Sequence, residues 1–152
     1  EHGKGDHKYD NVRVGINGRL DTLQAAVLLE KMTIFPEEIR LRNTVAAKYT
    51  ESLKNKVITP SIPDGYVSAW AQYSILAESS DHRTEIQERL KNYDIPTAIY
   101  YPIPLHLQTA FTKLGYRKGD FPVSESTSER ILSLPMHPYL TETDIEKITS
   151  LV

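Results

Sequence analysis

The chain has 152 residues, of which 39% are hydrophobic and 25% are charged. This length and apolar content fit roughly one globular domain with a buried core, and they exclude a disordered polypeptide. Lysine and arginine total 18 against 20 aspartate and glutamate residues. The chain therefore has no basic excess of the kind that binding to a nucleic-acid backbone needs.

The chain contains no cysteine, which excludes disulfides, thiolate metal sites and thiol nucleophiles. No apolar run approaches the length of about 18 residues that spans a membrane, and no secretory leader opens the chain. We expect a soluble, cytoplasmic protein. Glu1 to Asp10 is a polar stretch without apolar periodicity, and we expect it to be a cut end. His2 and His7 lie five residues apart in this stretch, and we expect no metal site there.

The first half of the chain predicts two consecutive helices. Apolar residues at helical spacing between Leu20 and Leu28 indicate the first helix, with either Asp21 or Asn17 as its cap. Pro36 should end this helix near Ile34 and begin the next one. In the second helix, apolar residues recur every four positions, at Leu41, Val45, Tyr49 and Leu53.

The second half alternates strand-like and helix-like segments. The predicted strands are Val57–Pro60, Tyr66–Leu76 and Ile95–Ile99, of which the first two pair. The predicted helices are Asp81–Tyr93, Leu107–Leu114 and Ser124–Leu132, with a last helix opened by the capping box Thr141-Glu142-Thr143-Asp144. This order indicates an α+β domain with helices on one side of a small antiparallel or mixed sheet.

One candidate binding segment is Gly15 to Leu20, which carries Asn17 and Arg19 between flexible glycines and a helix start. An Asn amide donates a neutral hydrogen bond to a phosphate oxygen, and an Arg guanidinium holds a phosphate or a carboxylate with two parallel bonds. The segment therefore suits an anion. The alternative is a capping Asn beside an Arg in a surface ion pair.

A second candidate segment is Tyr100 to His106, where two tyrosines and a histidine accompany two prolines. Prolines lack the amide donor that a central strand needs, so the segment should be extended and exposed. The tyrosine rings of Tyr100 and Tyr101 can stack on a sugar or nucleotide, and the imidazole of His106 can donate to an oxygen. The alternative is a packed aromatic edge with His106 capping the next helix.

Six sequence pieces occur in an order and spacing that match one protein family. They are His2-Gly3 with Tyr9, Gly15 to Leu20, Gln24-Ala25-Ala26, Tyr100 to His106, Gly119-Asp120-Phe121-Pro122 and Ser133-Leu134-Pro135-Met136. Over essentially the whole chain they resemble the C-terminal part of the DegT/StrS family of nucleotide-sugar aminotransferases, which depend on pyridoxal 5'-phosphate. The resemblance implies the small C-terminal domain of a fold-type I, aspartate-aminotransferase-like enzyme, a small sheet flanked by helices. Residues 1–19 would be a polar connecting segment and residues 20–152 the small domain.

The resemblance also implies an activity for the full-length protein. It is strongest to family members that transfer an amino group to the C3 keto group of a UDP-linked 2-acetamido-3-oxo-uronic acid, for bacterial O-antigen, with glutamate as the expected donor. The lysine that binds the cofactor would lie in an N-terminal domain outside this chain, and neither Lys4 nor Lys8 fits the family's lysine motif. No catalytic residue is therefore expected in these 152 residues, which should be inactive alone.

The resemblance assigns roles to the two candidate segments. The family forms homodimers with shared active sites, so Asn17 would reach the cofactor phosphate of the neighbouring subunit. Arg19 would bind that phosphate or the substrate carboxylate. Tyr101 and His106 would contact the substrate, together with Tyr100, which stands where many members have His and is therefore not expected to transfer a proton. The alternatives are a non-catalytic module for sugar-nucleotide binding or dimer assembly, and a small carbohydrate-binding protein unrelated to transamination.

Overall fold

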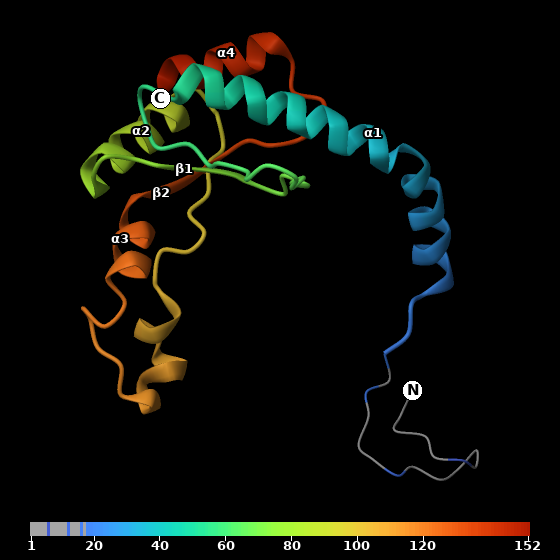
Figure 1. The fold of residues 1–152 in the computed structure, drawn as a ribbon, viewed down its shortest axis with the longest axis horizontal. Coiled ribbons are helices and arrows are strands. Elements are labelled where there is room, and N and C mark those ends of the chain that lie inside the picture. The colour runs from blue at the N-terminus through green and yellow to red at the C-terminus, as the bar shows by residue number, and fades with distance from the viewer. Residues whose placement is uncertain (1–5, 7–11, 13–15, 17) are drawn as a thin grey trace. The chain divides into compact units, whose positions relative to one another are not determined.

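The computed structural model describes residues 6, 12, 16 and 18–152 (Figure 1). The chain divides into two compact units, Glu1–Pro36 and Glu37–Val152. The α-helices are α1 (Thr22–Leu53), α2 (Ser80–Asn92), α3 (Pro122–Arg130) and α4 (Glu142–Leu151), the 3₁₀ helices are η1 (Leu105–Leu107) and η2 (Thr109–Leu114), and the strands are β1 (Tyr73–Leu76) and β2 (Ile131–Leu134). Among the described residues, no helix is both long and apolar enough to cross a membrane.

Helix α1 is continuous, so the predicted break at Pro36 is wrong. Proline in a helix interior removes one amide donor and costs about 3 kcal/mol. The helix-favouring residues on both sides, and the burial of Tyr49 and Leu53 further along, offset this cost. The predicted cap at Asp21 is confirmed, because its Oδ1 accepts hydrogen bonds from the amides of Leu23 at 2.8 Å and Gln24 at 3.4 Å.

Strands β1 and β2 pair antiparallel, with Ser74 opposite Ser133. The two serine hydroxyls form a hydrogen bond of 2.8 Å across the pair. The prediction that the helix from Ser124 runs to Leu132 is therefore wrong at its end, since β2 begins at Ile131. Local pattern misplaced this boundary because β2 is stabilised by pairing with a strand more than 50 residues away in sequence.

The other predicted strands are reduced to single bridges. Ile58 bridges to Leu76 on β1, and Ala98 bridges to Ser133 on β2, both antiparallel. The predicted pairing of the segments 57–60 and 66–76 thus exists only at one residue pair. The α+β class with a small antiparallel sheet is confirmed.

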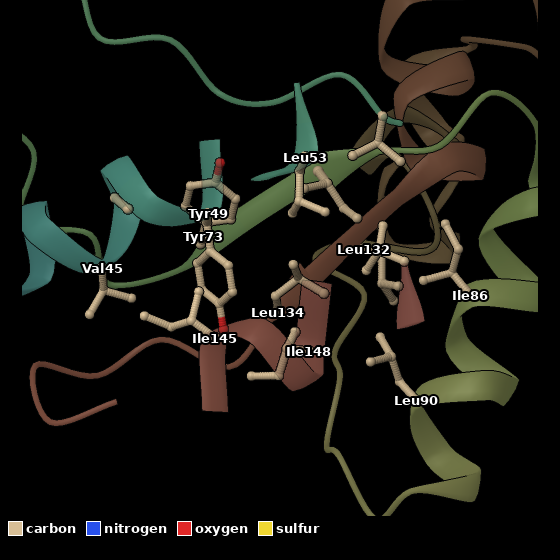
Figure 2. Packing of buried hydrophobic residues seen from close by; sticks show 14 of the residues in the cluster. Val45, Tyr49, Leu53, Tyr73, Ile86, Leu90, Leu132, Leu134, Ile145 and Ile148 are labelled. Atoms are coloured by element: carbon tan, nitrogen blue, oxygen red, sulfur yellow. The ribbon is translucent and has the colours of Figure 1, made fainter. Parts of the chain in front are cut away.

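The core of the second unit lies between the sheet and three helices (Figure 2). The largest side chains of this core have no exposed surface. They are Tyr49 and Leu53 of α1, Ile86 and Leu90 of α2, Tyr73 and Ile75 of β1, and Leu132 of β2. Helix α4 adds Ile145 and Ile148. The four-residue spacing predicted for the second half of α1 is confirmed at Val45, Tyr49 and Leu53, which are all buried. Trp70 and Tyr73 are also buried, and their ring centroids lie 5.5 Å apart.

Helix α4 opens with the predicted capping box. The Thr141 hydroxyl accepts from the Asp144 amide at 3.2 Å, and the Asp144 carboxylate accepts from the Thr141 amide at 3.0 Å. Hydrogen bonds that the Thr141 hydroxyl and the Thr141 amide donate to the Asp144 carboxylate hold the pKa of Asp144 below its usual value of 3.8. On the side of the β1–β2 pair away from α4, residues 100–121 and α3 extend outward (Figure 1). This outer part carries one of the candidate sites.

Candidate functional site

A pocket of about 570 Å³ lies between the segment that starts at Tyr100 and helix α3. One wall consists of Tyr100, Tyr101, Ile103, Pro104 and Leu105, here called the tyrosine wall. The two tyrosine rings meet edge to face, with centroids 5.7 Å apart. Tyr100 is 42% exposed and Tyr101 is 71% exposed. The predicted exposure of this segment is confirmed, and both rings are available to stack on a ligand.

The opposite wall of the pocket is formed by α3. It presents the hydroxyl-bearing residues Ser124, Thr127 and Ser128, and Gln108 adds an amide at the edge. The residues that line this pocket in the described part of the chain carry no formal charge. Their combination of apolar surface, aromatic rings and neutral donors suits an uncharged, hydroxyl-rich or heterocyclic part of a ligand.

His106 lies next to the tyrosine wall, where it contacts Glu125 of α3. Its Nε2 atom is 3.0 Å from Glu125 Oε1, and the two side chains are 8% and 11% exposed. The Glu125 carboxylate also accepts hydrogen bonds from the Gly119 amide at 2.8 and 2.9 Å and from the Phe121 amide at 3.3 Å. We call these four residues, His106, Gly119, Phe121 and Glu125, the Glu125 cluster.

The environment of the Glu125 carboxyl favours its ionised form. Burial alone would raise the pKa, but hydrogen bonds from the Gly119 amide, the His106 imidazole and the Phe121 amide outweigh burial. Together they hold the pKa of Glu125 below its usual value of 4.5. An ionised carboxylate only accepts hydrogen bonds, so His106 Nε2 is the donor in their contact.

Aromatic packing and a tight turn complete the cluster. The His106 ring lies 4.7 Å from the Phe121 ring, and Tyr116 meets Phe121 edge to face at 5.0 Å. Gly119 has a φ of 100°, a conformation that residues with a side chain rarely adopt. This turn places the Gly119 amide against the carboxylate.

The other candidate segment belongs to the first unit. Arg19 is exposed and lies three residues before α1 begins at Thr22. Asn17 lies outside the described residues. Within the described part of the chain, no group of three or more His, Cys, Asp or Glu side chains is arranged to hold a metal ion. Cofactor or anion binding at this segment thus stays a prediction from its amide and guanidinium.

Comparison with known proteins identifies the family of this chain. The sequence profile of the DegT/DnrJ/EryC1/StrS aminotransferase family matches residues 1–152. The chain belongs to this family. The predicted fold-type I relationship is also confirmed by a crystal structure of a DegT/DnrJ/EryC1/StrS aminotransferase from Brucella abortus. It is 53% identical, with a TM-score of 0.91, over 99% of this chain and 39% of that chain.

Curated relatives in the DegT/DnrJ/EryC1/StrS family show how much of a family member this chain represents. UDP-2-acetamido-2-deoxy-3-oxo-D-glucuronate aminotransferase of Pseudomonas aeruginosa is 47% identical over 97% of this chain and 39% of its own length. The pleiotropic regulatory protein of Geobacillus stearothermophilus is 41% identical over 93% of this chain and 38% of its own length. The chain therefore spans about two fifths of the length of these relatives.

Sequence reasoning missed Glu125, which lies beside the candidate pocket and contacts His106. Tyr100 and Tyr101 line the pocket, and His106 is close by but turned to the Glu125 cluster. The available signal for Glu125 was its place in the first turn of a helix that begins with Pro122. Acidic side chains there accept from backbone amides, as Glu125 does from the amide of the N-cap residue Phe121.

Proposed function

We propose that the full-length protein is a pyridoxal-phosphate-dependent aminotransferase of nucleotide sugars. Its reaction transfers an amino group, with glutamate as donor, to the C3 keto group of a UDP-linked 2-acetamido-3-oxo-uronic acid in the supply of sugars for O-antigen. The observation that carries this proposal is the 47% identity, over 97% of this chain, to an aminotransferase named for that 3-oxo-glucuronate substrate.

The chemistry of the pocket supports a sugar nucleotide as ligand. Tyr100 and Tyr101 offer exposed aromatic faces, and α3 offers hydroxyl groups opposite them. Rings of this kind stack on sugars and bases, while hydroxyl groups exchange hydrogen bonds with sugar hydroxyls. In this proposal Tyr100 and Tyr101 contact the substrate directly. His106 lies next to the tyrosine wall, on the side of the pocket that we assign to the substrate.

The anionic parts of cofactor and substrate need charged or amide donors, which Asn17 and Arg19 provide. Pyridoxal phosphate, when bound, supplies an electron sink that stabilises negative charge at the reacting carbon. The Asn17 amide suits the cofactor phosphate. The exposed Arg19 guanidinium suits either that phosphate or the carboxylate of a uronic acid. The donor chemistry of this segment fits the cofactor.

Exposed apolar side chains on the first half of α1 support an assembly larger than this chain. Leu23, Val27 and Met32 are 79%, 60% and 67% exposed. Apolar surface of this extent is usually covered by another domain or subunit. We propose a homodimer in which Asn17 serves the cofactor site of the neighbouring subunit.

The direct test uses the full-length protein with pyridoxal phosphate, glutamate and the UDP-linked 3-oxo-uronic acid. We expect formation of the 3-amino sugar together with an equal amount of 2-oxoglutarate, which mass spectrometry and a coupled assay measure. Replacing Asn17 with Ala should weaken cofactor binding by about 1–3 kcal/mol, roughly 5- to 150-fold, because one phosphate hydrogen bond is lost. Unchanged cofactor affinity would contradict the role of Asn17.

A second experiment decides between the two anions offered to Arg19. Arg19→Lys keeps the charge but removes the planar pair of donors. If Arg19 binds the substrate carboxylate, kcat/KM falls for the uronic acid and not for the analogue with CH₂OH in its place. If Arg19 binds the phosphate, cofactor affinity falls, and kcat/KM falls equally for both substrates. Arg89→Lys, at an exposed position on α2, is the matched control and should change neither quantity.

The alternative is a non-catalytic module that binds sugar nucleotides or assembles dimers. The observation that favours this alternative is the 41% identity to a relative that is named a pleiotropic regulatory protein and not an aminotransferase. The two proposals differ in one measurement. A full-length protein that binds UDP-sugar and forms no amino sugar from any 3-oxo sugar, with glutamate or any other amino-acid donor, would favour the module over the aminotransferase.

A further inference from the structure

The two walls of the pocket are linked through the Glu125 cluster. The tyrosine wall runs directly into His106, and α3 carries Glu125 between Ser124 and Ser128 of the opposite wall. The contact of 3.0 Å between His106 Nε2 and Glu125 Oε1 therefore connects one wall to the other. Both side chains are about nine-tenths buried, so this link is shielded from solvent.

Protein donors already engage both oxygens of the Glu125 carboxylate. Two backbone amides and one imidazole donate to its two oxygens, which together offer about four acceptor positions. These donors also offset its negative charge. An ionised carboxylate beside the pocket can therefore coexist with an anionic ligand such as a nucleotide sugar.

We propose that Glu125 is a positioning residue that sets the spacing of the pocket walls. Through His106 it holds the tyrosine wall against α3, and through Gly119 and Phe121 it fixes the turn that leads into α3. This proposal rests on the proposed function, because it makes Glu125 a determinant of affinity for the sugar-nucleotide substrate. A wall that is displaced by even one ångström loses stacking and hydrogen bonds together.

The test compares Glu125→Gln with Glu129→Gln in the full-length protein. Gln has the shape of Glu but lacks the charge, and its amide nitrogen cannot accept from a backbone amide. Glu129 lies on the same helix, is 58% exposed and has only a distant contact of 3.9 Å to Lys118, so it is a matched control. KM for the sugar substrate, kcat, and the single-turnover rate with the amino donor are measured separately.

We expect Glu125→Gln to raise KM for the sugar substrate about tenfold, with little change in kcat, because roughly one net charged hydrogen bond is lost. The donor half-reaction should stay within about twofold of wild type. Hydrogen exchange should accelerate at the Gly119 amide, which donates to Glu125, and at the amides of Leu107 and Gln108, which donate to carbonyls of the tyrosine wall. Glu129→Gln should change none of these quantities.

Two further variants separate positioning from a general structural role. The side-chain amide of Gln can donate to Glu125 as imidazole Nε2 does, so His106→Gln should retain more affinity for the sugar than His106→Ala. An unchanged sugar KM in Glu125→Gln, equal losses in both half-reactions, or equal effects of the two His106 variants would overturn the proposal. If the wild-type protein transfers no amino group, the proposed function fails, and hydrogen exchange at the Leu107 and Gln108 amides in Glu125→Gln then decides the positioning role alone.

Discussion

The apolar core and the Glu125 cluster lie in the same unit of the chain but are stabilised by different forces. The core buries Tyr49, Ile75 and Leu132 completely, and its stability follows the apolar area removed from water. The Glu125 cluster depends on three donors that converge on one carboxylate. The difference teaches that separate residues maintain the fold and the pocket, so each can be disturbed while the other stays intact.

The largest expected effect comes from shortening a core side chain. Leu132→Ala should lower the free energy of unfolding of the core by roughly 2–5 kcal/mol, because it leaves a cavity beside β1. Hydrogen exchange of the β1 and α2 amides measures this loss. Leu107→Ala, at a position 38% exposed in η1, is the control and should have a smaller effect. Equal acceleration of exchange at Gly119 by Leu132→Ala would show that core and cluster do not open separately.

A smaller effect is expected from a buried hydroxyl in the core. Tyr49 donates a hydrogen bond of 3.0 Å to the Pro135 carbonyl. Burial raises the pKa of Tyr49 far above its usual value of 10, so the hydroxyl stays a donor at any physiological pH. Tyr49→Phe leaves that carbonyl without its partner and should cost about 1–2 kcal/mol.

Urea-dependent hydrogen exchange of the full-length protein measures the effect of Tyr49→Phe. Tyr139→Phe is the matched control. Its hydroxyl contacts Glu38 at 2.7 Å, but Tyr139 is 62% exposed, so water can replace the lost bond. A larger loss for Tyr139→Phe than for Tyr49→Phe would contradict the assignment of stability to the buried core.

The cap of α4 tests a local contribution to the core. Thr141→Ala removes the hydroxyl that accepts from the Asp144 amide and should destabilise α4 by about 1 kcal/mol. Thr143→Ala, at an exposed position within the helix, should cause no such loss. Exchange rates of the α4 amides distinguish the two variants. Equal rates in both would show that the capping box contributes nothing measurable.

The smallest of these effects on the stability of the whole unit is expected from acidification, which should open the Glu125 cluster alone. Because the folded pKa of Glu125 lies below 4.5, the cluster is stabilised above that pH, and the stabilisation is lost as pH falls through the folded pKa. Exchange at the Gly119 amide, corrected for its intrinsic pH dependence, should accelerate there while exchange in β1 does not. Glu125→Gln should abolish this pH dependence at Gly119. If it persists in that variant, another group controls the turn.

Sequence patterns predicted features that depend on neighbours in the chain. The spacing of Tyr49 and Leu53 gave the buried face of α1, and the Thr141 capping box gave the start of α4. The prediction of a helix break at Pro36 was wrong, because the good helix formers on both sides outweigh one missing hydrogen bond. Strand β2 was misread because its partner β1 is remote in sequence.

In the candidate site, too, only the features that depend on neighbouring residues in the chain could be predicted. The prolines of the Tyr100 segment correctly indicated exposed tyrosines, since that property is local. Glu125 could not be found in this way, because its donors come from a turn whose direction depends on the unusual backbone of Gly119. The Gly119 amide is only six residues away in sequence, but the turn that directs it at the carboxylate leaves little trace in residue spacing.

The uncharged lining of the pocket has a consequence for how substrate affinity responds to ionic strength. Mobile ions screen contacts between formal charges, with a Debye length of about 8 Å at 0.15 M, but they hardly weaken stacking or hydrogen bonds between neutral groups. The share of affinity that comes from the tyrosine wall and the α3 hydroxyls should thus survive added salt. The part of the affinity that comes from the exposed guanidinium of Arg19 should decrease as salt is added. A salt titration of substrate binding can therefore apportion recognition between neutral and charged contacts without any mutation.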